Sequence, residues 1–536
     1  MGGAGEDPNC GKAVMARPAC GRAWQRPVSA PMLESHTEVL VIGAGPTGLF
    51  FAGELARHGV RARIIDASAA PHSQTRATGI QPAALEVLHR SGVVEKFLAE
   101  GVPVKGLRVI DRERREAFVS SPPPMHTPYP FTCSMPQWRT EEILAERLAA
   151  VGIEVERGVT AQDIVPSESG ARVHCVDQDG SELVIHADYL VGAGGAHSPV
   201  RGALREHLEG ITYPRRYLVA DVRASGVHNG RDLLTVAISA AGMLMVVQLP
   251  ADRTLLVTDL PEGEMPAAAP GLDAVRNALA CHLTAPFEIS DLRWASMYHT
   301  HRRMAPKFSE GPCFLAGDAA HLCSPLGGEG MNSGILDGAS LAWKLGAILR
   351  RNGKRSLLEA YHPERNEIAR QVLASSEAMH EFYYALVAMA VAGKPLAEPP
   401  AARDRNVTSP AMLDLAFHNS PIVGFHGSAA QGEGPRPGSR FPERTRLRGC
   451  LHHLLVYGSA EGHSEHFADR WSGTLDVLRG EAICPPELAG VSPRGAALIR
   501  PDGYIGFQAQ TWDVEARDAL DGFLDRQFAP ADESAG

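Results

Sequence analysis

Residues 39–48, which read VLVIGAGPTG, decide the fold of this chain. An apolar run precedes a glycine-rich turn, and a helical pattern follows the turn through His58. Gly59 stands where a helix commonly ends, and residues 60–65 form a second apolar run that leads to Asp66. Two short apolar runs joined by a helical segment predict buried parallel strands. The order is typical of a βαβ unit that binds a dinucleotide.

The glycines of the turn have the spacing GxGxxG, and each has a separate use. Gly43 permits the tight turn, Gly45 lets the backbone approach a pyrophosphate, and Gly48 lets the helix pack closely on the strand. Free N–H groups at the start of the helix attract phosphate, and an acidic side chain after the second strand accepts hydrogen bonds from a ribose. The motif predicts a dinucleotide without distinguishing FAD from NAD. Its predicted cofactor-binding residues are Gly43, Gly45, Pro46, Thr47, Gly48 and Asp66.

A second glycine-rich region favours FAD. Residues 313–345 read CFLAGDAAHLCSPLGGEGMNSGILDGASLAWKL. Asp318 follows an apolar strand and can accept hydrogen bonds from a chain of sugar-like hydroxyls. The loop 325–330 opens a helix whose free N–H groups can hold an electron-rich carbonyl oxygen. Two separate polar sites suit a long flavin dinucleotide better than a nicotinamide cofactor lying across one βαβ unit.

The chain resembles the group A FAD-dependent aromatic hydroxylases, which have the para-hydroxybenzoate hydroxylase fold. It is most similar to the larger phenol and polyketide hydroxylases, which carry a C-terminal thioredoxin-like domain. The resemblance covers residues 37–390 most closely and residues 437–530 less closely. The family pattern GDAAHxxxPxxGxGxNxxxxDxxxLxWKL is matched by Gly317, Asp318, Ala319, Ala320, His321, Pro325, Gly328, Gly330, Asn332, Asp337, Leu341, Trp343, Lys344 and Leu345.

The resemblance implies roles for individual residues. Asp318 would bind the ribityl chain of FAD, Pro325 would lie beside the isoalloxazine, and Arg76 would lie near the phosphates. The backbone around Met331 would face the pyrimidine end of the flavin, and Gln137 would contact the cofactor. The cofactor-binding residues that the resemblance implies are Arg76, Gln137, Asp318, Pro325, Gly328, Gly330, Met331 and Asn332.

The resemblance also implies a reaction. NADPH or NADH reduces FAD, O₂ adds at flavin C4a, and the resulting hydroperoxide transfers one oxygen atom to an electron-rich ring. The partners are then O₂ and a small phenolic or polycyclic aromatic substrate, which the strand-rich region 205–300 is expected to enclose. Baeyer–Villiger insertion or epoxidation on the same scaffold is an alternative. No catalytic residue is assigned, because nothing in the sequence places Tyr298, His299, His301 or His321 in a pocket.

In one motif the chain departs from the family. The family usually has DYLVGxDGxxSxVR, whereas residues 188–201 read DYLVGAGGAHSPVR, so Gly194 replaces an aspartate. In the family this motif is tied to the binding of FAD and of NAD(P)H. Losing hydrogen bonds to a buried partner costs about 1–3 kcal/mol. Either the substitution is tolerated, or reduction by NADPH is impaired and the protein binds its ligand without turnover.

The predicted fold class is α/β: a Rossmann-type FAD-binding domain interleaved with a β-sheet substrate domain, followed by a C-terminal thioredoxin-like α/β domain. The first residues show no periodicity and predict a disordered leader, or a true start at Met32. The expected divisions are a leader (1–35), the FAD-binding domain (36–104, 134–204 and 292–393), the substrate sheet (105–133 and 205–291), a linker (394–443) and the C-terminal domain (444–536).

Composition limits the remaining possibilities. The 536 residues are 44% apolar and 21% charged, as in ordinary soluble proteins. A net charge of −10 without a basic stripe argues against a nucleic-acid-binding protein. The sequence contains no apolar run of about 18 residues, so we expect no membrane-spanning helix. The nine cysteines include no CxxC pair, so we expect no metal site or disulfide and a reducing, cytoplasmic location. The protein is expected to be a monomer or a homodimer.

Overall fold

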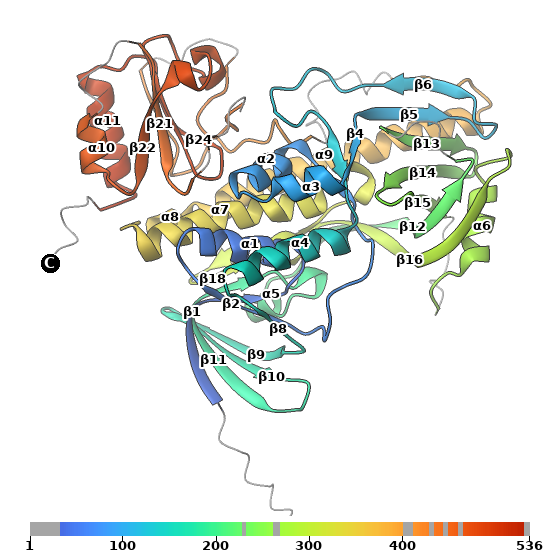
Figure 1. The fold of residues 1–536 in the computed structure, drawn as a ribbon, viewed down its shortest axis with the longest axis horizontal. Helices are drawn as coiled ribbons and strands as arrows, with labels where there is room; N and C mark the ends of the chain where they lie inside the picture. The colour runs from blue at the N-terminus through green and yellow to red at the C-terminus, as the bar shows by residue number, and fades with distance from the viewer. Residues whose placement is uncertain are drawn as a thin grey trace, which may run out of the picture.

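The computed structural model describes residues 33–227, 232–260, 268–399, 411–427, 434–442, 447, 449–458 and 465–529. Residues 1–32, most of the predicted leader, lie outside this description. The described chain forms four sheets with helices packed between and around them (Figure 1). This mixed α/β architecture confirms the predicted fold class. None of the helices in the described ranges is long and apolar enough to cross a membrane.

The first sheet holds the predicted βαβ unit at its centre. Its strands are β1 (Leu33–Ile42), β2 (Ala62–Asp66), β8 (Val155–Arg157), β9 (Thr160–Ser167), β10 (Gly170–Val176), β11 (Glu182–Gly192), β17 (Ser309–Glu310) and β18 (Cys313–Leu315). The order is β17-β18-β11-β1-β2-β8, with β10 and β9 joined to β11. β1 pairs in parallel with β2 and β11, and β11 pairs in parallel with β18. Both glycine-rich motifs therefore follow parallel strands at the same edge of one sheet, where such folds bind ligands.

β1 begins earlier than the sequence predicts. The apolar pattern starts near Glu38, whereas the strand starts at Leu33 and includes three residues of the predicted leader. Residues 33–37 continue the parallel pairing, with Leu33 opposite Leu183. Residues 34–37 have polar, partly exposed side chains, so this extension has no apolar pattern from which it could be recognised.

Helices pack on and beside this sheet (Figure 1). They are α1 (Pro46–Arg57), α2 (Pro82–Arg90), α3 (Val94–Glu100), α4 (Gln137–Ala150), α5 (Pro199–Ala203), α7 (Gly330–Arg350), α8 (Ser356–Glu359) and α9 (Tyr361–Val391). Small residues of α7 allow a close approach to α1. A Cβ atom at Gly338 would lie 3.1 Å from Phe50, and one at Gly346 would lie 2.4 Å from the His58 side chain. The helix of the first motif thus packs on the helix of the second.

The second large sheet, called the substrate sheet below, contains strands from the segments predicted for it (105–133 and 205–291). It also includes residues 292–304 and 321–322, which were predicted to belong to the FAD-binding domain. It consists of β5 (Gly106–Ile110), β6 (Glu116–Ser120), β12 (Glu209–Ser225), β13 (Leu233–Ser239), β14 (Gly242–Leu249), β15 (Arg253–Leu260), β16 (Glu288–Met304) and β19 (His321–Leu322). One face packs on α6 (Leu272–Ala280), a helix absent from the sequence prediction. The other face, with Tyr217 and Val219, packs against α9 and against Leu326 of the second motif. A small sheet of β3 (Gly79–Ile80), β4 (Val102–Val104) and β7 (Thr132–Ser134) completes this part.

The C-terminal domain is a mixed sheet with two helices against it. Its elements are β20 (Gly424–His426), β21 (His452–Val456), α10 (Glu465–Arg470), β22 (Leu475–Arg479), β23 (Ala496–Ile499), β24 (Ile505–Ala509) and α11 (Val514–Asp525). The strand order is β20-β24-β23-β21-β22. β20 lies within the predicted linker, and Met412, Leu415 and Phe417 of the same segment are buried in the main core. This part of the predicted linker is therefore packed structure, which its many Pro, Gly and polar residues conceal.

Buried charged residues join the C-terminal domain to the FAD-binding domain. Arg500 donates to both carboxylate oxygens of Glu364 on α9, at 2.6 and 2.9 Å, and to Asp502 at 2.5 Å. Lys344 of α7 donates to Glu364 at 2.8 Å, and the Trp343 indole donates to Asp502 at 2.9 Å. Each charge in this cluster has a partner, as burial in a low-dielectric interior requires.

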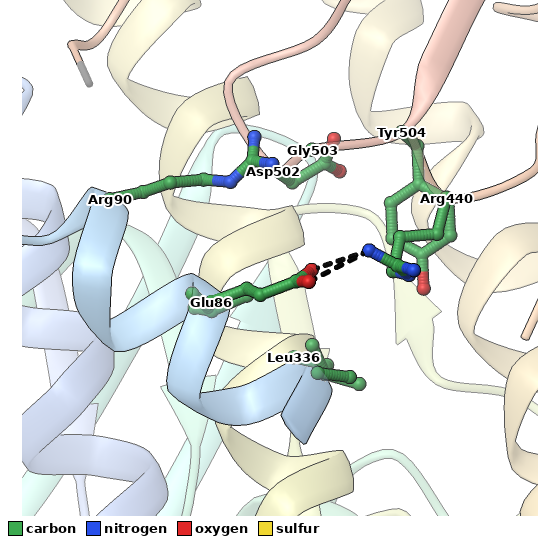
Figure 2. A pocket seen from close by; sticks show the side chains of 9 residues that line it. Glu86, Arg90, Leu336, Arg440, Asp502, Gly503 and Tyr504 are labelled. Carbon is green, nitrogen blue, oxygen red and sulfur yellow. Dashed lines mark hydrogen bonds and ion pairs between the residues drawn. The ribbon is translucent and has the colours of Figure 1, made fainter. Parts of the chain in front are cut away.

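A second contact lies nearby, between α2 and the C-terminal domain. Figure 2 shows Arg440 reaching toward Glu86, where it donates to both carboxylate oxygens at 2.9 and 2.7 Å. The Arg90 side chain extends toward Gly503 from the same helix (Figure 2). Gly503 has φ +87°, and a Cβ atom there would lie 2.6 Å from the Arg90 guanidinium carbon. The close approach of Arg90 therefore requires glycine at this position.

Candidate cofactor and substrate site

The turn after β1 has two glycines that the fold requires and one that keeps space open. Gly43 has φ +113°, and a Cβ atom there would lie 2.4 Å from the carbonyl oxygen of Ala193. A Cβ atom at Gly48 would lie 1.9 Å from the carbonyl oxygen of Gly43. A Cβ atom at Gly45 would have no neighbour within 4 Å. The fold alone does not require glycine at position 45, so the open space beside it suits a ligand.

The start of α1 faces this space. Gly45 is its N-cap residue, Pro46 is in its first turn, and no side chain caps its free N–H groups. Asp66 holds the surrounding loops, because its carboxylate accepts hydrogen bonds from the backbone N–H of Ala44 and of Ser68, each at 2.7 Å. A carboxylate has about four acceptor sites, so Asp66 retains capacity for a further donor.

Thr47 brings the second motif against the first. Cβ atoms at Gly317 of η2 (Gly317–Ala319) and at Gly334 of α7 would lie 2.5 and 2.1 Å from its hydroxyl oxygen. The adjacent residue of η2, Asp318, is exposed and accepts no hydrogen bond from the described residues. Desolvation by the surrounding protein raises the pKa of Asp318, against the opposing charges of His321 and Arg76. The site therefore presents an unpaired acceptor close to the open turn.

Asp337 of α7 holds the second motif together through a set of buried hydrogen bonds. It accepts hydrogen bonds from the Gly317 N–H at 2.9 Å and from Arg365 at 2.7 Å, and its carboxylate lies 2.9 Å from His321 Nε2. Burial alone would raise the pKa of Asp337, but Arg365 and His321 outweigh it and lower this pKa to about 2. His321 is therefore bound within the scaffold, and this gives no support to a role as a catalytic base.

The glycine-rich loop before α7 is held by side-chain amides. η3 (Pro325–Gly327) leads to Gly328, which has φ +64°. Asn332 donates to the carbonyl oxygens of Gly79 and Gly328, at 2.8 and 2.7 Å, and accepts from the Gln81 N–H at 2.9 Å. The buried Asn332 side chain is thus fully used inside the protein. At Asn332, the backbone is therefore the part that remains to meet a ligand.

The remaining predicted contacts come from neighbouring segments. Gln137, at the start of α4, donates to Glu141 at 2.9 Å, while Arg76 is exposed. Thr75 donates to Asp221 of β12 at 2.7 Å, and Asp221 also accepts from Arg253 at 2.6 Å. The segment with Arg76 is therefore anchored to the substrate sheet. This contact could not be predicted from the sequence, because residues 75 and 221 are far apart in the chain.

Aromatic residues cover the face of the substrate sheet that meets η3. Tyr217 and Tyr298 stack with ring centroids 6.4 Å apart. The Tyr217 hydroxyl lies 3.2 Å from that of Tyr384 on α9, which donates to Asp259 at 3.1 Å. Burial raises the pKa of all three phenols, that of Tyr384 to about 12, so they remain hydrogen-bond donors. The sequence singled out Tyr298 but not its partners.

Two other candidates have the opposite orientation. β-strand residues alternate between faces, so His299 and His301 of β16 lie on the face opposite Tyr298. His299 contacts the Tyr213 carbonyl and His301 contacts Thr212, at 3.3 and 2.9 Å. Burial raises the pKa of the Cys323 thiol, which disfavours the reactive thiolate. The structure therefore gives no support to these residues as a base or nucleophile.

Gly194, which replaces the family's aspartate, lies beside the first turn. It is exposed, and a Cβ atom there would make ordinary contacts, the nearest being 3.5 Å from Pro199. Its φ of −79° suits any residue. Nothing in the local geometry requires glycine at this position, so an aspartate can be accommodated.

Comparisons with known proteins agree with this geometry. The chain matches a family model described as FAD binding domain over residues 36–376, and one described as aromatic-ring hydroxylase, C-terminal, over residues 435–531. It is 33% identical to the 6-methylpretetramide 4-monooxygenase of Streptomyces rimosus, over 93% of this chain and 96% of that protein. It is 29% identical to the pentachlorophenol 4-monooxygenase of Sphingobium chlorophenolicum, over 90% of this chain and 96% of that protein.

Solved structures show the same fold over nearly the whole chain. The flavin-dependent monooxygenase PieE, in complex with FAD and substrate, superposes with a TM-score of 0.77 at 21% identity, covering 92% of this chain and 99% of that one. The anhydrotetracycline hydroxylase OxyS from Streptomyces rimosus gives 0.72 at 26% identity, covering 93% and 100%. On these matches, the chain belongs to the FAD-dependent aromatic-ring monooxygenases that carry the aromatic-ring hydroxylase C-terminal domain.

Proposed function

We propose that this monooxygenase binds FAD across the two glycine-rich motifs and uses NADPH or NADH, with O₂, to hydroxylate a phenolic or polycyclic aromatic small molecule. The observation that supports this most is the meeting of both motifs at Thr47, where an open turn adjoins the unpaired carboxylate of Asp318. The names of the relatives, which act on 6-methylpretetramide and on pentachlorophenol, support the substrate class.

The residues present suit FAD. The N–H groups of α1 and the open space at Gly45 would hold the pyrophosphate, with Arg76 nearby, and Asp66 would accept from the ribose of the adenosine half. Asp318 would accept from the ribityl hydroxyls. Pro325, Gly328 and the backbone of residues 330–332 would line the ring, and Gln137 would complete the site. When bound, the flavin supplies the activation of O₂.

The protein's own contribution is to bind and orient the substrate and to exclude water. The face of the substrate sheet that packs toward η3 is apolar and aromatic. Such a surface suits a flat ring and keeps water away from the reacting atoms. Tyr298 remains protonated, so it can donate to an oxygen atom of a phenolic substrate. The hydroxyl protons of Tyr217 and Tyr384 are already used in the bonds to Tyr384 and Asp259. The described cysteines are all free thiols, which is consistent with the proposed location in the reducing cytoplasm. Light scattering would decide between a monomer and a homodimer.

Anaerobic addition of NADPH to the purified yellow protein tests this function. We expect the flavin absorbance to bleach, and to bleach faster with a phenol from a mixed panel than without one. Subsequent addition of O₂ should then yield a product heavier by one oxygen atom. A flavin that stays oxidised under all these conditions would contradict the proposal.

Asp318→Ala is expected to preserve the fold and weaken FAD binding. Asp318 makes no hydrogen bond within the described protein, so stability should change by no more than about 0.5 kcal/mol. The loss of charged hydrogen bonds to the cofactor should raise the Kd for FAD about tenfold to 100-fold. Flavin fluorescence titration of the apoprotein measures this. Asp469→Ala, at an exposed position of α10, is the control and should bind FAD normally.

Gly194→Asp tests the possibility that NADPH reduction is impaired. Because a Cβ atom fits and the site is exposed, melting temperature and FAD binding should equal those of the parent protein. We expect the anaerobic rate of flavin reduction by NADPH to rise, since a hydrogen-bond acceptor returns beside the cofactor turn. If the rate of flavin reduction by NADPH is the same in Gly194→Asp and in the parent protein, Gly194 does not limit that rate.

A further inference from the structure

Glu329 is a buried carboxyl group without a complete set of partners. It stands at the N-cap of α7 between Gly328 and Gly330, and its side chain is 1% exposed. Its Oε2 atom has no hydrogen-bond partner among the described residues. Its side chain also interacts with the hydroxyl group of Ser375 on α9. A buried polar atom without a partner is costly, so this arrangement requires an explanation.

The carboxyl group lies directly against the loop proposed to meet the flavin. A Cβ atom at Gly327 would lie 2.6 Å from Glu329 Oε2, so glycine at this position makes room for the carboxyl. Gln81 holds the other side of the same turn by donating to the Gly327 carbonyl oxygen at 3.1 Å. Any change in charge on Glu329 therefore acts on this loop at close range and with little screening by water.

Among the residues that the structure describes, no cation compensates Glu329. Desolvation raises the pKa of Glu329 to about 8, and the opposing influence within this part of the chain is the uncharged hydroxyl of Ser375. The titratable group that faces it is the thiol of Cys323, between β19 and η3, whose pKa is itself raised, chiefly by burial and also by Glu329 and Asp318. Neither η3 nor the first turn of α7 presents another charged side chain to it. An isolated carboxylate here would be unstable, so the neutral acid is the favoured form at neutral pH.

We propose that Glu329 is the group through which pH sets the reduction potential of the bound flavin. The proposal rests on the cofactor site proposed above. Two electrons from the reductant enter the flavin ring, and Glu329 exchanges one proton with solvent. Negative charge gained by the ring favours the neutral acid, and an ionised Glu329 disfavours reduction. Glu329 acts here through its charge alone, by shifting the equilibrium of flavin reduction, and it forms no bond to the flavin or to the substrate.

Redox titration of the holoenzyme at several pH values tests this inference. We compare wild type with Glu329→Gln, which keeps the shape and cannot ionise, between about pH 6 and about pH 9.5. At the acidic end the two potentials should agree. At the alkaline end the equilibrium constant for reduction should be about tenfold lower in wild type, a difference of about 30 mV for a two-electron couple. Glu359→Gln, which removes an exposed carboxyl of α8, should follow wild type throughout.

The possible failures can be distinguished. A variant or parent that does not retain FAD would contradict the proposed function. Yellow proteins whose potentials depend on pH in the same way, with and without Glu329, would overturn this inference alone. Infrared spectra of wild type give a second reading that does not depend on the variant. A protonated carboxyl band that disappears as the pH rises above about 8 is expected, and its absence at neutral pH would also overturn the inference.

Ionisation of Glu329 should also make the stability of the folded protein depend on pH, and the sign of this effect can be predicted. The folded pKa of Glu329, about 8, lies above the ordinary value of 4.5. Its contribution is therefore fully present below pH 4.5 and is lost as the pH rises toward 8. Thermal unfolding of the two holoproteins should show wild type losing melting temperature relative to Glu329→Gln across this range. Parallel curves would indicate that Glu329 is ionised in the folded protein.

Discussion

Arg500→Ala is expected to lower the free energy of unfolding by about 3–5 kcal/mol, because it leaves two buried carboxylates with too little positive charge. Arg500 is 1% exposed and makes paired hydrogen bonds with Glu364 and Asp502. Burial alone would raise the pKa of Asp502, yet Arg500 and Lys344 hold it at about 2. Without Arg500, Lys344 is the one cation of the described residues that is left to compensate both acids.

Denaturant unfolding of the holoprotein measures the effect, with Arg494→Ala as the matched control. Arg494 is an exposed arginine in the same domain, and its loss should change stability by no more than about 0.5 kcal/mol. We also expect Arg500→Ala to release FAD more readily, because the residues that dock this domain, Trp343 and Lys344, belong to the helix that begins at the flavin loop. Equal stability of the two variants would show that the charged cluster is not what joins the domains.

Gly45→Ala and Gly48→Ala are expected to separate the ligand's need for glycine from that of the fold. At Gly45 the added methyl group meets no protein atom within 4 Å, so the variant should be as stable as the parent. The methyl group occupies the space proposed for the pyrophosphate, and we expect the Kd for FAD to rise at least about 100-fold. At Gly48 the methyl group would lie 1.9 Å from a backbone oxygen, so the turn must open. This variant should lose both FAD and about 1–3 kcal/mol of stability.

Flavin fluorescence titration and thermal unfolding, performed on both variants, give the comparison. Gly202→Ala is the control, since a Cβ atom there also meets nothing within 4 Å and the residue lies in α5. It should match the parent in both measurements. Parental FAD affinity in Gly45→Ala would exclude the open space beside the turn as the pyrophosphate site.

The helices and strands that could be predicted well from the sequence are those determined by residues close together in the chain. Glycine spacing, apolar runs and helical periodicity fix the βαβ unit, the second motif and the strands of residues 153–191, and these agree with the structure. The resemblance supplied the C-terminal domain. Family, fold and reaction class are confirmed by the comparisons. The cofactor roles of individual residues remain predictions, and for Asn332 the structure limits that role to its backbone.

The features that the sequence missed depend on partners far along the chain. Glu364 and Arg500 look like surface residues until they are placed together, since charges are buried only when paired. Thr75 and Asp221 illustrate the same limit, because neither belongs to a recognisable motif. Met412 and Phe417 are scattered among polar residues, so their burial follows from the surface they meet and leaves no pattern of their own. The buried state of Glu329 likewise depends on α9, which follows it in the chain.

The contact of Thr47 with Gly317 also has a consequence for synthesis of the protein. The two residues are about 270 positions apart, so on a ribosome the N-terminal unit emerges tens of seconds before its partner. During that time the apolar side chains of α1, including Phe50 and Phe51, lack the surface of α7 that later covers them. The nascent chain must therefore be protected from aggregation until the second motif is made, and the flavin site can form only late in translation.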